Sequence, residues 1–143
     1  MLLEVEDVTV AYDARVAAEQ VQFALAQGNI GCLLGPSGSG KSTVLRAIAG
    51  FEPVRTGRIV VGGHEMSTPR RHVPPERRSV GMVFQDFALF SHLNVAGNIA
   101  FGIRSWSAPD RRARIAGLLE LVGLAHRERS FPHQLSGGEQ QRV

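Results

Sequence analysis

The most informative stretch of the sequence is Gly35-Pro36-Ser37-Gly38-Ser39-Gly40-Lys41-Ser42-Thr43. It satisfies the pattern G-x-x-x-x-G-K-[ST] in full, which is typical of a phosphate-binding loop. In such a loop the glycines let successive backbone N–H groups point at one anion, and the start of the following helix adds its partial positive charge. Lys41 would reach the β- and γ-phosphates, and the Ser42 hydroxyl would bind Mg²⁺. The stretch therefore predicts a site for a nucleoside triphosphate.

The residues on either side of the loop support this prediction. The apolar run at residues 30–34 predicts a buried strand, with Cys32 as an ordinary core residue. Residues 42–49 predict a helix that ends at Gly50. Three apolar side chains share one face of that helix: Val44, Leu45 and Ile48. The alternative, a Gly/Ser turn before an ordinary helix, does not account for a strand, a glycine loop and a helix in this order.

Composition indicates an ordinary globular domain, with 143 residues, 43% of them hydrophobic and 20% charged. The net charge of +3 comes from arginine, because Lys41 is the only lysine. Four arginines cluster within residues 67–78: Arg70, Arg71, Arg77 and Arg78. A nucleic-acid surface is one interpretation, but no aromatic residue interleaves with them and prolines interrupt the run. We expect a solvated loop there and no nucleic-acid partner.

The sequence predicts a soluble protein of a reducing compartment. Cys32 is the only cysteine, which excludes an internal disulfide. Acidic residues come early in the chain and no basic segment precedes an apolar run, so the N-terminus does not resemble a signal peptide. No apolar run is long enough to span a bilayer. Any role at a membrane would then depend on a partner.

The pattern of apolar residues divides the chain into a mixed α/β part and a helical part. Strands are predicted within residues 3–10, 21–25, 58–61 and 80–84, the last of which ends at Gln85. From about residue 86, Asn94 and Ser107 each predict the cap of a helix. Apolar residues recur at helical spacing behind both caps: Val95, Ile99 and Ile103, then Ile115, Leu118, Leu119 and Val122, with Gly123 ending the second helix.

The last stretch is Leu135-Ser136-Gly137-Gly138-Glu139-Gln140-Gln141-Arg142-Val143. Ser136 and Glu139 have the spacing of a capping box, which predicts a helix that starts at Gly137. An isolated helix of about two turns is marginal, so we expect the natural chain to continue past Val143. Alone, this motif predicts an ordinary helix cap. In one chain with the phosphate-binding loop it is far more specific.

Together these motifs resemble the nucleotide-binding subunit of an ATP-binding cassette (ABC) transporter, over all 143 residues. Residues 135–140 match the signature motif of that family. Tyr12 matches the aromatic residue that stacks on adenine, and Gln85 matches the glutamine that contacts Mg²⁺ and relays the nucleotide state to the membrane partner. Considered alone, Tyr12 would be a half-buried surface residue and Gln85 an ordinary amide at a strand end.

The resemblance implies a fold and a set of site residues. The fold is α/β: a phosphate-loop core with an antiparallel β subdomain (together residues 1–85) and a helical signature subdomain (residues 86–143), incomplete at the C-terminus. ATP would contact Tyr12, Gly35, Pro36, Ser37, Gly38, Ser39, Gly40, Lys41, Ser42, Thr43 and Gln85. Mg²⁺ would contact Ser42 and Gln85. In a head-to-tail homodimer the second copy would complete the site in trans with Ser136, Gly137, Gly138 and Glu139.

The catalytic half of the family's site is not present in this sequence. The family has an aspartate that binds Mg²⁺, a glutamate that activates water and a histidine near the γ-phosphate, all after the signature. Glu120 and Glu139 do not match, because both lie on predicted helices. We therefore expect no catalytic residue before Val143, ATP hydrolysis by the longer protein, and no turnover by these 143 residues alone.

The resemblance also implies partners and a location. Transmembrane permease subunits and a second ATPase would bind the protein at the cytoplasmic face of the inner membrane. An apolar surface between Gln85 and Phe101, which includes Phe87, Phe90 and Leu93, would form a groove for a short permease helix, although these side chains could instead be local core.

The resemblance is strongest to importer ATPases. Residues 50–52 (Gly-Phe-Glu) and 98–102 (Asn-Ile-Ala-Phe-Gly) favour the group of importers for ferric iron and polyamines. We expect ferric iron as the solute, with polyamines, sulfate and sugars as alternatives. Two other classes stay open: a chromosome-maintenance or repair ATPase, which the absence of sustained heptads disfavours, and a non-catalytic nucleotide-binding module.

Overall fold

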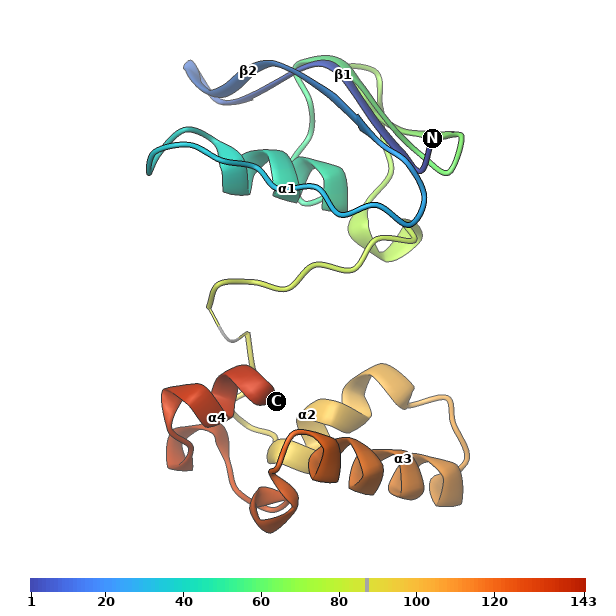
Figure 1. The fold of residues 1–143 in the computed structure, drawn as a ribbon, viewed down its shortest axis with the longest axis vertical. Coiled ribbons are helices and arrows are strands. Elements are labelled where there is room, and N and C mark those ends of the chain that lie inside the picture. Colours follow the sequence, from blue (N-terminus) through green and yellow to red (C-terminus); the bar gives the residue numbers. More distant parts are fainter. Residues whose placement is uncertain (87) are drawn as a thin grey trace. The chain divides into compact units, whose positions relative to one another are not determined.

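The computed structural model describes residues 1–86 and 88–143 and divides the chain into two compact units, Met1–Val83 and Phe84–Val143 (Figure 1). We call them the sheet unit and the helical unit. Each has its own cluster of buried apolar side chains.

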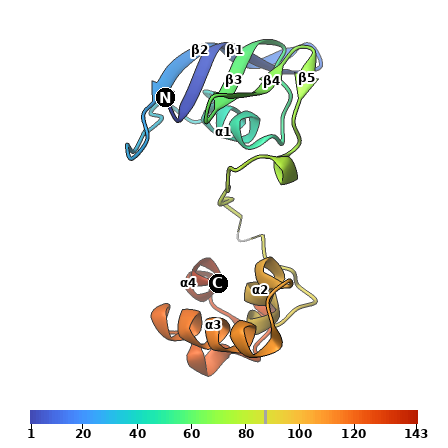
Figure 2. The same cartoon turned by 90° about the vertical axis from the view of Figure 1, so that its right-hand side faces the viewer.

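The sheet unit consists of one antiparallel sheet and one helix. Its strands are β1 (Leu3–Tyr12), β2 (Arg15–Leu25), β3 (Thr56–Val61), β4 (His64–Thr68) and β5 (Arg71–His72). They pair in the order β2-β1-β3-β4-β5, as Figure 2 shows. Helix α1 (Lys41–Ala49) lies against one face of this sheet (Figures 1 and 2). The predicted antiparallel strands and the predicted helix are confirmed, and the strands are longer than the sequence indicated.

The core of the sheet unit forms where α1 covers the sheet. Val5, Val8 and Val10 of β1 are at most 1% exposed, and they pack with apolar residues of α1. The prediction that Leu45 belongs to the buried face is wrong, since Leu45 is 49% exposed. Residues three and four positions apart share a helix face, so the buried partners of Val44 are Ala47 and Ile48. Leu45 lies about 100° around the helix from Val44.

Two predicted strands do not form. Residues 30–34 and 80–84 have no strand structure, and within the described chain neither run pairs with a strand. Ile30, Leu34 and Val83 are 98%, 87% and 97% exposed. A continuous apolar run is typical of a strand with neighbours on both sides, and without a neighbour its backbone groups have no ladder to join. The interpretation of Cys32 as a core residue is therefore also wrong, because Cys32 is exposed.

The predicted loop at residues 67–78 is wrong in part. It contains the end of β4, the short strand β5 and a 3₁₀ turn at Pro75–Arg77. Arg70, Arg71 and Arg77 are exposed, as expected of a solvated segment, but Arg78 is only 6% exposed. The guanidinium can be buried because its hydrogen bonds to backbone carbonyls of several segments replace those to water.

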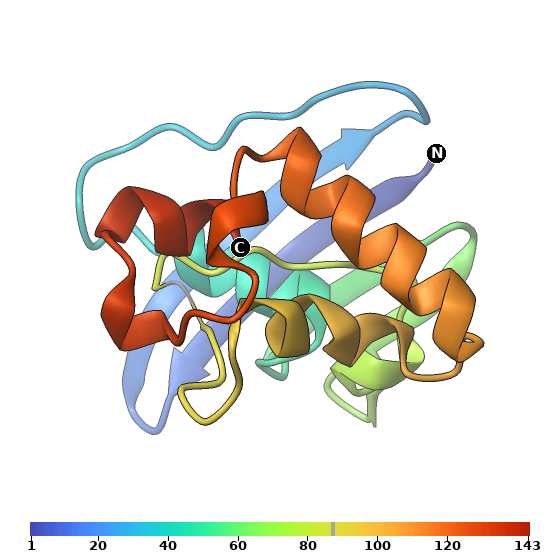
Figure 3. The same ribbon diagram turned by 90° about the horizontal axis from the view of Figure 1, so that it is seen from below.

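The helical unit contains α2 (Val95–Ala100), α3 (Ala108–Leu121) and α4 (Gly137–Arg142). Three 3₁₀ turns accompany them: Phe101–Ile103, Ala125–Arg127 and Pro132–Gln134. Helices α2 and α3 lie side by side in Figures 1 and 3 and share a core of Val95, Ile115, Leu119, Leu124 and Leu135. No helix in the described parts of the chain is long and apolar enough to cross a membrane.

The predicted caps of the helical unit are confirmed. The Asn94 side chain accepts a hydrogen bond from the Gly97 N–H (2.8 Å), and the Ser107 hydroxyl accepts one from the Asp110 N–H (3.3 Å). Such caps satisfy N–H groups that a helix start leaves without a partner. Gly123 has a φ of 71°, which ends the segment after α3 as predicted.

Because Cys32 is exposed in an unpaired segment, we expect a thiol reagent to label this chain under native conditions almost as fast as in urea. Fluorescence of a maleimide dye would measure both rates, and Cys32→Ser is the control for non-specific labelling. Protection by about 100-fold or more in the native state would show that residues 30–34 are buried, and would contradict this arrangement of the segment.

Candidate functional site

The phosphate-binding loop leads directly into α1. Gly35, Gly38 and Gly40 have φ values of 152°, 83° and 85°, a region that L side chains rarely adopt. Gly40 is the residue at the N-terminal cap of α1, and its carbonyl accepts the first helical hydrogen bond from the Val44 N–H (2.9 Å). The glycines therefore let the chain turn sharply into the helix.

Gly40 also has to be glycine because of its neighbour, strand β2. A Cβ atom at this position would lie 2.2 Å from the Ala17 carbonyl oxygen and 3.0 Å from the Ala18 Cβ. The loop is thus in close contact with β2, and its geometry depends on the sheet. Tyr12 belongs to the same hairpin, where it pairs with Arg15 at the end of β1 and is 42% exposed. Its predicted role in stacking on adenine stays a prediction.

Lys41 lies within the loop that precedes it. Its ammonium donates hydrogen bonds to the carbonyl oxygens of Gly35 (2.9 Å) and Pro36 (2.7 Å), and to the Ser39 hydroxyl (3.4 Å). Neither of the two ion pairs found in the described residues includes Lys41. The positive charge therefore remains available to an anion that enters the loop.

The start of α1 adds further donors. Among the described residues, no side chain caps this helix start, and its first turn contains no acidic residue. The first N–H groups of a helix have no intrahelical acceptors and carry the positive end of the helix dipole. Ser42 is exposed in this first turn, where its hydroxyl can serve as a hard oxygen ligand. The arrangement suits a phosphate group.

The other predicted site residues belong to the helical unit. Gln85 is exposed near its start, and the signature residues 136–139 lie at the start of α4. The structure does not bring them together with Lys41 in one unit. Their assignment to the nucleotide stays a prediction.

Ser136 and Glu139 form the predicted capping box. Glu139 N–H donates to the Ser136 hydroxyl (3.3 Å), while one Glu139 carboxylate oxygen accepts from the Ser136 N–H (2.8 Å) and hydroxyl (2.9 Å). The other oxygen accepts from Arg127 Nε (3.0 Å). These contacts lower the pKa of Glu139 from 4.5 to about 2, with the hydrogen bond from the Ser136 backbone as the largest cause. Glu139 is therefore an ionised helix cap.

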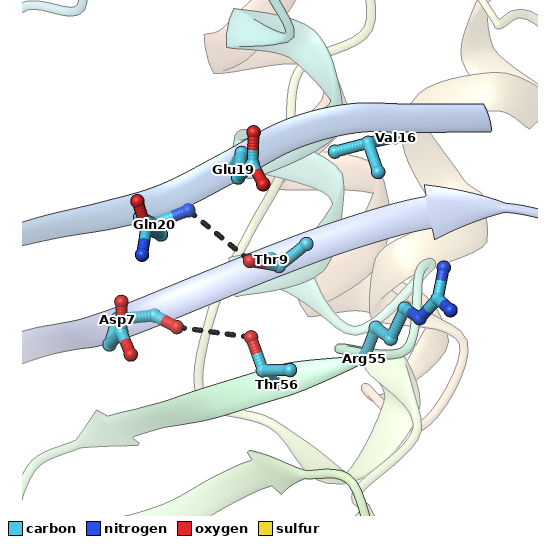
Figure 4. A pocket seen from close by; sticks show the side chains of 7 residues that line it. All are labelled: Asp7, Thr9, Val16, Glu19, Gln20, Arg55 and Thr56. Carbon is cyan, nitrogen blue, oxygen red and sulfur yellow. Dashed lines mark hydrogen bonds between the residues drawn. The ribbon is translucent and has the colours of Figure 1, made fainter.

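A separate pocket opens where the sheet is irregular. It has a volume of about 360 Å³ and is lined by Asp7, Thr9, Val16, Glu19, Gln20, Arg55 and Thr56 (Figure 4). Asp7 and Gln20 both have positive φ, and the Gln20 N–H donates to the Thr9 hydroxyl (3.2 Å). The pocket contains no residue of the phosphate-binding loop, and its mixed charges select neither a cation nor an anion. No pattern in the sequence predicts it, because it arises from register shifts between neighbouring strands.

No group of three or more metal-ligating His, Cys, Asp or Glu side chains occurs in the part of the chain that the structure describes. The predicted Mg²⁺ ligand Ser42 would supply a single oxygen donor, beside phosphate oxygens and water. Mg²⁺ commonly binds in this way.

Comparison with known proteins agrees with this geometry. The family model described as "ABC transporter" matches residues 18–143. The chain belongs to this family. The resemblance to the ABC transporter family stated above is thereby confirmed.

Similar curated proteins are import ATP-binding subunits. The Fe(3+) ions import ATP-binding protein FbpC of Streptomyces coelicolor is 47% identical over 99% of this chain. The sulfate/thiosulfate import ATP-binding protein CysA of Mycobacterium tuberculosis (strain ATCC 25618 / H37Rv) is 44% identical over 97%, and the 2-aminoethylphosphonate protein PhnT of Salmonella typhimurium, itself named as putative, is 42% identical over 96%. The chain spans about 40% of the length of such relatives.

Similar solved structures are ABC cassettes. The cassette MJ0796, described as a dimer in a post-hydrolysis state bound to ADP and Pi, matches with a TM-score of 0.84 and 28% identity. The match covers 98% of this chain and 66% of that one. The protein cbiO1 of Clostridium perfringens matches with a TM-score of 0.78 and 29% identity, over 99% of this chain and 58% of that one. The predicted α/β fold class of an ABC-type core, covered only in part, is confirmed.

Because the pKa of Glu139 is about 2 in the folded chain and 4.5 ordinarily, its charge stabilises the folded helical unit fully above pH 4.5. That contribution is lost as the pH falls from 4.5 through 2. We expect the Glu139 carboxyl carbon to titrate near pH 2 by NMR.

Urea unfolding at several pH values tests the consequence. Glu139→Gln should reduce the pH dependence of stability between pH 4.5 and 2, whereas Glu128→Gln, which removes an exposed carboxylate of the same unit, should leave it in place. Titration of Glu139 near its ordinary value would show that the capping box does not form in solution.

Proposed function

We propose that this chain is the ATP-binding part of an ATPase that drives solute import through a membrane permease. The observation that supports it best is the phosphate-binding loop, where Lys41 has three neutral hydrogen-bond partners and no ion pair in the described chain. Residues 35–43 would hold the β- and γ-phosphates of ATP, and the Tyr12 ring would stack on adenine. Mg²⁺, which neutralises phosphate charge, would be held by the Ser42 hydroxyl and the Gln85 amide oxygen.

We also propose that two copies of the protein bind ATP as a head-to-tail dimer. In this dimer, residues 136–139 of one copy would complete the nucleotide site of the other. The description of MJ0796 as a dimer supports this for a similar cassette. Hydrolysis by the longer protein would need a carboxylate that positions water. We assign that role to no residue among these 143, because Glu120 and Glu139 lie on α3 and α4.

The proposed solute is ferric iron. It rests on the similarity to two proteins named for Fe(3+) import, at 47% and 46% identity. Sulfate is nearly as well supported, at 44% identity, and a phosphonate, a polyamine or a sugar remains an alternative. Discrimination between solutes would be made by the permease and its binding protein, with the ATPase at the cytoplasmic face of the membrane.

The proposed permease contact is the aromatic surface of the helical unit. Phe90 and Phe101 are 38% and 42% exposed, their ring centroids lie 4.4 Å apart, and the Arg104 guanidinium lies 4.0 Å from the Phe101 ring centroid. Asn98 fixes this turn, since its amide accepts from the Phe90 N–H (2.8 Å) and donates to the Leu93 carbonyl (3.1 Å). A rigid, half-exposed aromatic pair suits an apolar helix as partner.

The alternative, that these side chains are local core, fits Leu93, which is half-buried. Phe87, the remaining member of the predicted groove, lies outside the described residues.

Nucleotide binding is tested by Lys41→Ala. Removal of one charge-assisted contact to phosphate costs about 1.5–3 kcal/mol, or about a tenfold to 150-fold increase in Kd for Mg-ATP. Calorimetric titration of the 143-residue chain measures it. Arg46→Ala is the matched control, because it removes an exposed positive charge from the same helix and should leave Kd within about twofold. Equal affinities of wild type and Lys41→Ala would refute the proposed site.

The permease contact is tested by cross-linking from a cysteine at Ser91, which is exposed beside Phe90. In the assembled transporter with Cys32→Ser as background, we expect Ser91→Cys to cross-link to the permease. His64→Cys, at the exposed first residue of β4 in the sheet unit, is the control and should not. A cross-linking yield no higher at Ser91 than at His64 would count against the aromatic surface as the docking site.

A further inference from the structure

Arg78 carries a buried positive charge that the phosphate-binding loop does not use. The residue is 6% exposed, and neither of the ion pairs in the described chain includes it. Burial lowers the pKa of the guanidinium from its ordinary value. A buried charge normally has a counterion or a full set of hydrogen bonds, and Arg78 has the second.

One side of the guanidinium binds the end of α1. Its Nη1 donates to the carbonyl oxygens of Ala47 (2.8 Å) and Ile48 (2.9 Å), in the last turn of the helix. The last carbonyls of a helix lack intrahelical donors and carry the negative end of the helix dipole. The helix end thus takes the place of a counterion.

The other side binds the sheet. Nη2 donates to the Ser67 hydroxyl (2.6 Å) and the Met66 carbonyl (3.2 Å) of β4, and Nε donates to the Val73 carbonyl (2.6 Å). Ser67 is fully buried. One planar group therefore joins α1, β4 and the segment after β5.

The chain leaves room for this group at Gly50, the C-terminal cap of α1. Gly50 has a φ of 93°, and a Cβ atom there would lie 2.6 Å from Arg78 Nε. His72 of β5 approaches the same place, with its Nε2 3.1 Å from the Gly50 carbonyl oxygen. The C-terminal end of α1 is thus fixed by side chains from two neighbouring segments.

We infer that Arg78 is a positioning residue for the phosphate-binding loop, which it controls through α1. The inference rests on the proposed nucleotide site. With nine residues, α1 is a short rod of about 13 Å. It is held at one end by the contact of Gly40 with β2 and at the other by Arg78. Release of the Arg78 end would let the helix tilt and shift Lys41, and a shift of about 1 Å can cost about 100-fold in an interaction that depends on geometry.

The affinities for two nucleotides show whether Arg78 positions the loop or only stabilises the fold. Trinitrophenyl-ATP and trinitrophenyl-AMP share base and fluorophore and differ in the β- and γ-phosphates. A smaller folded fraction raises both apparent Kd values by the same factor. A displaced loop raises the Kd for the ATP analogue more, because Lys41 is aimed at the β- and γ-phosphates.

In the 143-residue chain we expect Arg78→Met to raise the Kd for the ATP analogue about tenfold or more relative to the AMP analogue. Arg78→Lys should recover part of the loss, because an ammonium can still donate to the carbonyls of Ala47 and Ile48. Arg77→Met, which replaces the adjacent exposed arginine, is the matched control and should leave both Kd values unchanged. Circular dichroism gives the folded fraction of each variant.

Each outcome decides the question. If Arg78→Met leaves the ratio of the two Kd values unchanged, the inference is overturned. The proposed nucleotide site would still stand if Lys41→Ala weakens binding of the ATP analogue. If Arg78→Met does not fold, Arg78→Lys takes its place, and failure of both to fold would show a structural role only. If Lys41→Ala also binds both analogues like the wild type, the proposed nucleotide site itself is wrong.

Discussion

The contact between Gly40 and β2 is the constraint on which the candidate site depends. With only 2.2 Å between a hypothetical Cβ and the Ala17 carbonyl oxygen, no other residue type fits without moving the strand. The loop is therefore built on the antiparallel sheet and on α1 at the same time. The glycine at position 40 is then a requirement of packing as much as of phosphate binding.

The two ends of α1 differ in their partners, since a positive side chain binds the C-terminal end and, within the described residues, no side chain caps the N-terminal end. At the C-terminal end the Arg78 guanidinium donates to the carbonyls of Ala47 and Ile48, whereas at the N-terminal end no described side chain caps the amides. A cation at the negative end stabilises the helix without competing for its positive end. Lys41 adds a charge at that positive end whose present partners are neutral oxygen atoms. The N-terminal end of α1 and the Lys41 ammonium are therefore complementary to an anion.

The sequence predicted correctly those parts of the structure that depend on residues close together in the chain. The glycine loop, α1, and the caps at Asn94, Ser107 and Ser136 all depend on contacts within a few positions. The strands expected at residues 30–34 and 80–84 depend on partners elsewhere, and an apolar run cannot show whether they are present. The burial of Arg78 could not be predicted for the same reason, because its partners on α1 lie about thirty positions away. Its own neighbours in the sequence are prolines and exposed charges, which indicate a solvated loop.

The signature residues show how a local motif limits a proposed role. The Ser136 hydroxyl already donates to Glu139 and accepts from the Glu139 N–H, while the second Glu139 oxygen is held by Arg127. A phosphate could gain a hydrogen bond from Ser136 only if that hydroxyl left the Glu139 carboxylate. The net gain would be the difference between two charge-assisted hydrogen bonds, which is small compared with either. The capping box would still hold Ser136 in place through its backbone N–H, so Glu139 serves the signature by fixing its geometry, whether or not its hydroxyl partner exchanges.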